Sequence, residues 1–210
     1  MQNVSVQSRC APIFTIGHSH HTIEVFIGLL KKHVVEMVVD VRSTPASRFA
    51  PHFSREQINP ALKAAGVRYT FIGDLLGGCP SDKTCWDDNH VSYTKLMQHP
   101  PFQLGVDRVL NGSRNSLTVA LMCTERDPMD CHRSLAITRA LAVSGADVHH
   151  IHGDGTIETH AHLEVRLLEK FGLDSGPSLF ESSSNLLTKA YALQEAKIAY
   201  RQSHATDLAE

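Results

Sequence analysis

The 210-residue sequence lacks the features of membrane-spanning, exported and strongly nucleic-acid-binding chains. No apolar run approaches the roughly 18 residues needed to cross a bilayer, and the polar N-terminus has no apolar core of a secretory signal. Charge of neither sign dominates, since 20 Lys and Arg face 22 Asp and Glu. This balance excludes the global basic field that drives non-specific binding to DNA or anionic membranes. We therefore expect a soluble, cytoplasmic protein with no membrane partner.

Paired-cysteine and phosphate-loop motifs are also absent. The five cysteines are an odd number in a chain long enough to bury its own core, so free thiols are expected rather than a disulfide framework. Cys123 and Cys131 are eight residues apart and Cys79 and Cys85 six apart, which is not the spacing of a structural zinc knuckle. No G-x-G-x-x-G or P-loop occurs, so the sequence disfavours an NAD or ATP enzyme and assigns no cofactor.

What the sequence does contain is an alternation of short apolar runs and amphipathic stretches. The apolar runs predict five strands, at residues 13–17, 34–41, 67–72, 117–123 and 148–151. Strands alternating with helices predict an α/β fold with a single doubly wound, mainly parallel sheet in a Rossmann-like three-layer arrangement. We expect one domain over residues 13–172, followed by an extension over residues 173–210; periodicity does not give the strand order.

The extension is predicted to contain a linker and a helix. Residues 173–184 are rich in Ser, Gly and Pro, as linkers are. A terminal helix is expected over residues 186–200, with Leu186, Ala190 and Leu193 on one side. This helix is expected to dock either on the domain or on a partner.

Two further segments carry local signals. Ser54 with Gln57 resembles a capping box that opens a helix up to about residue 65, which Pro60 should kink or split. Residues 73–90 have no periodicity and are expected to form a long surface loop.

Polar and reactive residues follow the predicted strands. Ligands of open α/β sheets bind beyond the carboxyl ends of the strands, so these residues are expected to share one edge. In strand order they are His18 and Ser19, Asp40 and Arg42, Asp74, Cys123 and Glu125, and His152 and Asp154. The motifs Asp-x-Arg and Cys-x-Glu stand at the ends of fully apolar strands, which indicates a functional site rather than an ordinary polar loop.

The densest cluster follows the fourth strand, where a short loop enters a helix at Cys131, His132 and Arg133. The positive end of a helix favours an anion, and Arg133 could supply a bidentate fork for phosphate or carboxylate. The same field lowers thiol pKa values, so Cys131 or Cys123 is a candidate thiolate nucleophile. Glu125 or His132 could then transfer protons.

A structural alternative accounts for the same residues. Cys123 could be a small core residue, Asp130 a helix cap, and Arg133 the partner of Asp40 in a buried ion pair. The functional interpretation instead predicts one shared pocket. Its members would be Asp40, Arg42, Cys123, Glu125, Cys131, His132 and Arg133.

Several ordered motifs together resemble the DUF488 family. They are T-I-G-H-S at 15–19, D-V-R-S-T-P-x-S at 40–47, F-S at 53–54, L-M-C-T-E-R-D-P-x-x-C-H-R at 121–133, G-x-D-V-x-H-I at 145–151 and H-G-D-G-T-I-E-T-H at 152–160. The resemblance covers roughly residues 13–170 and implies a compact Rossmann-like domain, but no reaction, because the family is named for its unknown function. The matching positions are His18, Ser19, Asp40, Arg42, Pro45, Ser47, Cys123, Glu125, Cys131, His132, Arg133 and His160.

Together these observations favour an enzyme, a Cys-dependent hydrolase or transferase acting on a phosphate-bearing, nucleotide-like substrate or a short nucleic acid. The candidate catalytic residues are Cys123, Glu125, Cys131, His132 and Asp40. The candidate anion-binding residues are Arg42, Arg133, His18, Ser19 and Ser47.

Two other functions remain open. A noncatalytic nucleotide or nucleic-acid binding module would hold an anion with Arg42 and Arg133, and the cations and aromatics near Arg48 and Phe49 resemble a stacking platform. A metal site would draw on soft and borderline ligands. Those ligands would be Cys123, Cys131, His132, His18 and Glu125. A homo-oligomer is also left open.

Overall fold

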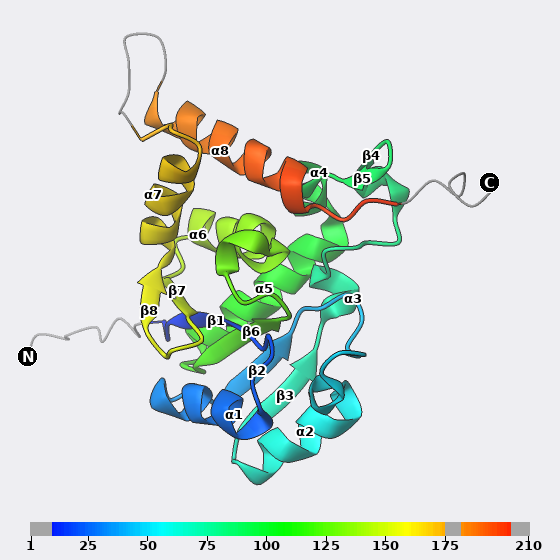
Figure 1. Ribbon diagram of the computed structural model, residues 1–210, viewed down its shortest axis with the longest axis vertical. Helices are drawn as coiled ribbons and strands as arrows, with labels where there is room; N and C mark the ends of the chain where they lie inside the picture. Colours follow the sequence, from blue (N-terminus) through cyan, green and yellow to red (C-terminus); the bar gives the residue numbers. More distant parts are fainter. Residues whose placement is uncertain (1–9, 175–181, 203–210) are drawn as a thin grey trace, which may run out of the picture.

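The computed structural model describes residues 10–174 and 182–202, which contain a six-stranded sheet with helices on both faces (Figure 1). The strands are β1 (Ile13–Gly17), β2 (Met37–Asp40), β3 (Arg68–Phe71), β6 (Val119–Cys123), β7 (Val148–Ile151) and β8 (Ile157–Thr159). Their order is β3-β2-β6-β1-β7-β8, parallel throughout except for the antiparallel β8. This arrangement confirms the predicted α/β class and the Rossmann-like three-layer fold.

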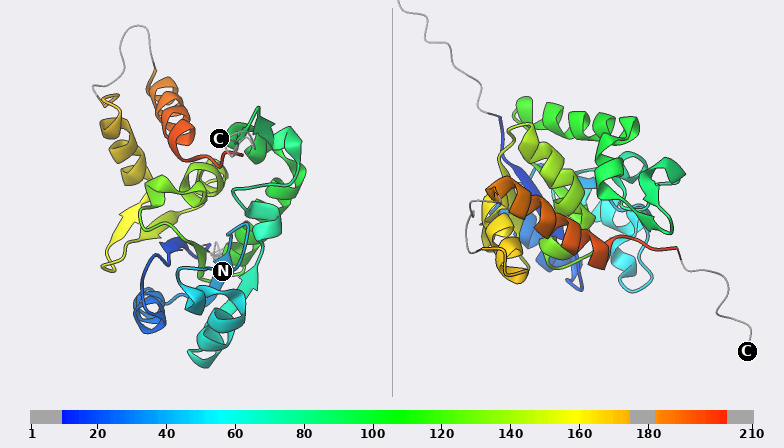
Figure 2. Two further views of the ribbon diagram at one scale, coloured as in Figure 1. Left: turned by 45° about the vertical axis from the view of Figure 1, so that its right-hand side comes forward. Right: turned by 90° about the horizontal axis from the view of Figure 1, so that it is seen from above.

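Two helical layers enclose the sheet. The helices are α1 (Ile23–Lys32), α2 (Arg55–Ala64), α3 (Gly73–Leu76), α4 (Tyr93–Gln98), α5 (Pro100–Arg114), α6 (Arg139–Val143), α7 (His160–Lys170) and α8 (Ser183–Ile198). The view from above in Figure 2 separates α1 and α2 from α5 and α6 across the sheet. Because strand side chains alternate, Val38 packs with α1 and α2, whereas Val39 packs with α5 and α6. None of the helices in the described ranges is long and apolar enough to cross a membrane.

The central strand β6 lies between β1 and β2, although these two are consecutive strands of the sheet in the sequence. Its five residues are all buried, as its apolar composition predicts. The register sets Gly17 beside Cys123 and Asp40 beside Met122, so three carboxyl ends meet at one edge. Gly17 is required there, since a Cβ would overlap the carbonyl group of Glu125.

Some strand and loop boundaries differ from the predicted ones, in one case because apolar residues lie in a turn. The strand expected over 34–41 begins at Met37, because Val34 has a φ of 53° in the turn after α1. Residues 73–90 are not one long loop, since they contain α3 and part of a hairpin. The hairpin strands are β4 (Trp86–Asp87) and β5 (His90–Val91). The sequence also gave no indication of the three-residue antiparallel strand β8.

The predicted capping box of α2 was wrong, and of the two effects expected of Pro60 the split does not occur. Ser54 occupies the N-cap position, but its side chain makes no cap hydrogen bond and instead accepts one from the Ser47 amide at 3.1 Å. Pro60 neither splits the helix nor ends it. Pro60 and Glu56 are both exposed, so water can bond the carbonyl group that loses its donor.

The helix α8 docks on the domain itself. It buries Leu186, Ala190, Tyr191 and Gln194, whereas Leu193, expected on the same side, is 40% exposed. The Gln194 amide donates to the Met129 carbonyl oxygen at 3.1 Å and to Asp130 at 2.8 Å. Most of the predicted linker, residues 175–181, lies outside the described residues.

A buried chain of polar side chains ties the sheet to α7 and α8. Thr15 bonds His150 at 2.8 Å, His150 faces His160 at 3.2 Å, and the second His160 nitrogen meets the Tyr191 hydroxyl at 3.1 Å. That hydroxyl donates to Glu164 at 2.9 Å. Burial lowers the pKa of His160 to about 4 and that of His150 well below its ordinary value, so both rings are neutral in the folded protein.

The two buried neutral histidines of this hydrogen-bonded series predict that the protein loses stability in mild acid. The unfolded His160 takes up a proton below a pKa of about 6.5, but the folded one does so only near 4, so stability falls as the pH drops between these values. For His160 alone the expected loss is about 3 kcal/mol by pH 4. Urea unfolding across this range measures it, and His160→Gln should flatten the profile. An unchanged slope in that variant contradicts the assignment.

Candidate active site

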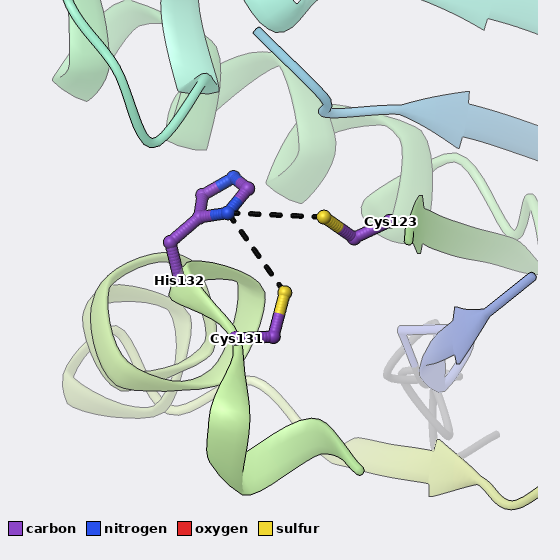
Figure 3. Close-up of side chains that lie close together, drawn as sticks. All are labelled: Cys123, Cys131 and His132. Carbon is purple, nitrogen blue, oxygen red and sulfur yellow. Dashed lines mark hydrogen bonds between the residues drawn. The ribbon is translucent and has the colours of Figure 1, made fainter. Parts of the chain in front are cut away.

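Three reactive side chains meet at the carboxyl edge of the sheet (Figure 3). Cys123 ends β6, while Cys131 and His132 lead into a helix. The Nδ1 atom of His132 is 3.8 Å from the sulfur of Cys123 and 3.8 Å from that of Cys131. All three residues are buried, and their ligand atoms lie within 4.8 Å of one another.

The loop that links these residues is held by Arg133. This side chain is fully buried and donates from Nη1 to the Glu125 carbonyl oxygen at 2.8 Å and from Nη2 to that of Arg126 at 3.4 Å. The helix opens as a π-helical segment, Arg133–Thr138, and the Thr138 hydroxyl bonds the Arg133 carbonyl oxygen at 2.8 Å. Such π segments are rare in proteins overall, and those that occur are often found at functional sites.

The orientation of the His132 ring is fixed from both sides. Its Nε2 lies 3.1 Å from the Val41 carbonyl oxygen, an acceptor only, so Nε2 carries a proton and donates it. Gly78 packs against the ring, where a Cβ would come within 2.8 Å of it. The Nδ1 atom is therefore directed at the two sulfurs.

The charge state of the cluster follows from its contacts. The Arg133 amide donates to the Cys131 sulfur at 3.4 Å. Burial alone would raise the pKa of Cys131, but a hydrogen bond from Cys123 and the charges of Arg133 and His132 lower it well below the ordinary value. The hydrogen bond to Cys131 and burial raise the pKa of Cys123 well above its ordinary value. These directions favour a single thiolate, on Cys131, beside a neutral Cys123 thiol.

His132 and Glu125 respond to that thiolate. Burial lowers the pKa of His132, but the Cys131 charge outweighs burial and raises it overall. Burial and the Cys131 charge raise the pKa of Glu125, whose Oε2 lies 3.1 Å from the Cys123 sulfur. Both pKa values are thus raised, which favours the protonated form of each side chain, the form that can give a proton to a leaving group.

These groups face a cavity of about 460 Å³. Its lining includes Arg42, Ser43, Thr44, Cys79, Tyr93, Cys123, Thr124, Glu125, Asp130, Cys131, His132, Ile198 and Tyr200. A second cavity of about 1010 Å³ adjoins it through the shared residues Thr124, Glu125 and Asp130. The larger one is lined by His18, Ser19, Ser47, Phe49, Arg126, His152 and Asp154, among others. Asp74 is exposed on α3 and lines neither.

Asp40 does not line either cavity. It follows Val38 by two residues and therefore points to the α1 and α2 face, away from Cys123. There Arg42 binds it through Nε at 2.9 Å and Nη2 at 2.6 Å, and the Tyr69 hydroxyl donates to it at 2.7 Å. The alternative in which Arg133 pairs with Asp40 is wrong, since Arg42 occupies that position. The charge of Arg42 is accordingly balanced inside the protein.

The candidate anion-binding residues other than Arg42 lie in different surroundings. Arg133 lines neither cavity and binds backbone carbonyls, which gives it a structural role and leaves its predicted anion contact without geometric support. His18 is buried against Phe53 with ring centroids 4.4 Å apart, and burial lowers its pKa to about 4. Ser19 and Ser47 line the larger cavity with an exposed Phe49. Phe53 is fully buried and offers no stacking surface.

Sequence patterns gave no signal for part of the smaller cavity. Ile198 and Tyr200 come from the end of α8 and the segment after it, about 70 residues from Cys131 along the chain. The Tyr200 carbonyl oxygen accepts from the Val91 amide at 3.0 Å, and its ring meets Trp86 edge to face. Tyr93, at the start of α4, lines the same cavity. Only the folded chain brings these residues to the thiols.

The cysteine pair and His132 could also hold a metal ion, because two thiols and an imidazole nitrogen are ligands for Zn²⁺ and related cations. All five cysteines have free thiols, as the sequence predicted. The Cys123–Cys131 spacing argued against a zinc knuckle, but here the sulfurs converge from a strand end and a helix start.

Comparison with known proteins identifies the family. Residues 22–140 match the sequence profile described as Domain of unknown function DUF488, which is more than half of the chain. The chain belongs to the DUF488 family. This DUF488 match contains α1 to α5, β6 and the whole Cys123–His132 cluster, and it ends before α7 and α8. No curated protein and no solved structure matched the chain.

Proposed function

We propose that this DUF488 protein is a cysteine-dependent hydrolase or transferase in which Cys131 is the nucleophile. The observation that carries the proposal is the position of the Cys131 sulfur. It faces a cavity, accepts a hydrogen bond from the Arg133 amide at 3.4 Å and lies 3.8 Å from Nδ1 of His132. A thiolate stabilised by a helix N-terminus and an adjacent imidazolium is the activated form of a cysteine nucleophile.

The chemical step uses only groups of this pocket. The Cys131 sulfur gives an electron pair to an electrophilic phosphorus or carbon, and the bond to the leaving group breaks. The leaving group departs with its electron pair and takes a proton from His132 or Glu125. Water or a second substrate then attacks the adduct, gives its proton back to that base, and releases Cys131 as thiolate. Cys123 keeps its proton and donates a hydrogen bond.

The proposed substrate is phosphate-bearing and nucleotide-like. The 1010 Å³ cavity beside the thiols is large enough for such a molecule. Phe49, 87% exposed at its rim, offers a stacking face for a base, while Ser19, Ser47 and Arg126 offer donors for phosphate oxygens. Arg42 and Asp40 are assigned to positioning, since their charges balance each other.

A chromogenic phosphodiester tests the proposal. We expect the full chain to release p-nitrophenolate from the p-nitrophenyl phosphodiester of thymidine, and Cys131→Ser to reduce the rate at least about 100-fold. Cys85→Ser is the matched control, because Cys85 is buried in the core away from both cavities.

A wild-type rate in Cys131→Ser would show that this sulfur is not the nucleophile. Saturable binding of thymidine monophosphate without turnover of the phosphodiester would instead support the noncatalytic binding module.

A further inference from the structure

We propose that Cys123, Cys131 and His132 form a binding site for a thiophilic divalent cation such as Zn²⁺, and that the bound cation blocks Cys131. The blocking effect rests on the proposed function, because it requires Cys131 to be the nucleophile. The metal site itself does not.

The donor atoms already lie near the separations that a tetrahedral ion imposes. With Zn–S bonds of about 2.3 Å and Zn–N bonds of about 2.0–2.1 Å, tetrahedral geometry sets sulfur and nitrogen about 3.6 Å apart and the two sulfurs about 3.8 Å apart. The two observed separations from the His132 nitrogen are both 3.8 Å, and no pair of donors exceeds 4.8 Å. Small side-chain movements therefore suffice to close the site.

The backbone fixes which His132 nitrogen serves as ligand. Metal-binding histidines usually donate their second ring N–H to a carbonyl or carboxylate, which orients the ring and leaves the other nitrogen free to coordinate. Here the Nε2 proton is held by the Val41 carbonyl oxygen at 3.1 Å, and Nδ1 faces both sulfurs (Figure 3). The contact of Nε2 with the Val41 carbonyl oxygen therefore supports a metal site independently of the proximity of the three side chains.

Charge and access also suit a divalent cation. Two thiolates, a neutral imidazole and a doubly charged ion sum to zero, so the bound ion removes the repulsion that keeps Cys123 protonated. Three protein ligands leave the fourth position for water or for Glu125, whose Oε2 is 3.1 Å from the Cys123 sulfur. The 460 Å³ cavity connects this position to solvent.

Cobalt substitution tests the site on the full chain. After treatment with EDTA and a reductant, we expect one Co²⁺ per chain, with thiolate-to-metal charge-transfer bands and the visible bands of tetrahedral coordination. Cys123→Ser, Cys131→Ser and His132→Gln should each lose one-to-one binding at micromolar metal. Cys79→Ser, in the cavity but outside the cluster, and Cys85→Ser, in the core, should retain it.

His132→Gln separates ligand loss from misfolding. The glutamine amide can still donate to Val41, but it offers no nitrogen at the Nδ1 position. Thermal melting identifies any variant that fails to fold. Absent charge-transfer bands in the wild type, or retained one-to-one binding in a folded His132→Gln, would overturn the metal site.

Alkylation separates the two proposals. With Zn²⁺ added, we expect iodoacetamide to stop modifying Cys131, and EDTA to restore the modification. If Cys131 is inert without metal but Co²⁺ still binds, the nucleophile and its blocking are refuted and the metal site stands. If Cys131 reacts quickly and Zn²⁺ gives no protection, the metal proposal fails and the nucleophile stands.

Discussion

Replacing Asp40 by Asn is expected to lower the free energy of unfolding by about 3–5 kcal/mol, because it leaves the Arg42 guanidinium buried without its counter-charge. Asp40 is fully buried and Arg42 is 4% exposed. The carboxylate accepts the guanidinium Nε and Nη2 together with the Arg42 amide. Urea unfolding monitored by circular dichroism measures the change, and an unchanged m-value ensures that the same transition is compared.

Tyr69→Phe is the matched control. It removes the hydroxyl that donates to Asp40 at 2.7 Å and leaves the ion pair intact, so the expected loss is about 1 kcal/mol. If Asp40→Asn costs no more than Tyr69→Phe, the charge of Asp40 is not what holds Arg42. Arg42 Nη1 also contacts the His18 ring at 3.2 Å, so the ion pair holds this ring in place as well.

Local sequence patterns could predict those parts of the fold whose burial appears as a continuous or periodic run of apolar residues. Residues 119–123 are apolar throughout because the strand is covered on both faces, and this apolar run is visible in the sequence. The edge strand β8 has only one buried residue, Glu158, and so carries no apolar run. The π-helical segment Arg133–Thr138, which precedes α6, was also not predicted, because such segments are rare inside helices.

The candidate site shows the same limit. The rule that strand ends share an edge predicted seven residues around one pocket. The structure places five of them on the smaller cavity and leaves out Asp40 and Arg133; the five are Arg42, Cys123, Glu125, Cys131 and His132. The rule could not assign faces, and the alternation along β2 turns Asp40 to the opposite side. Contacts with residues far along the chain, such as Tyr200 with the hairpin, have no local signature at all.

The second large effect concerns the reactivity of Cys131 toward iodoacetamide. An ordinary thiol has a pKa of about 8.5 and is almost entirely protonated at about pH 6. The charges of His132 and Arg133 and the Cys123 hydrogen bond lower the Cys131 pKa well below that value despite its burial. In the native, metal-free protein we therefore expect Cys131 to be alkylated at about pH 6 at least about 10-fold faster than in the urea-denatured chain.

Peptide mass spectrometry after timed quenching measures this rate for each cysteine in one experiment. Cys79 is the internal comparison, because it lines the same cavity while its partial burial raises its pKa. As the pH is lowered, the reactivity of Cys79 should fall while that of Cys131 persists, because only a thiol with a lowered pKa remains a thiolate in acid. His132→Gln removes the neighbouring positive charge and should shift the Cys131 profile toward higher pH. If Cys131 reacts no faster in the native chain than in the denatured one, Cys131 is not an activated nucleophile, and covalent catalysis through it is refuted.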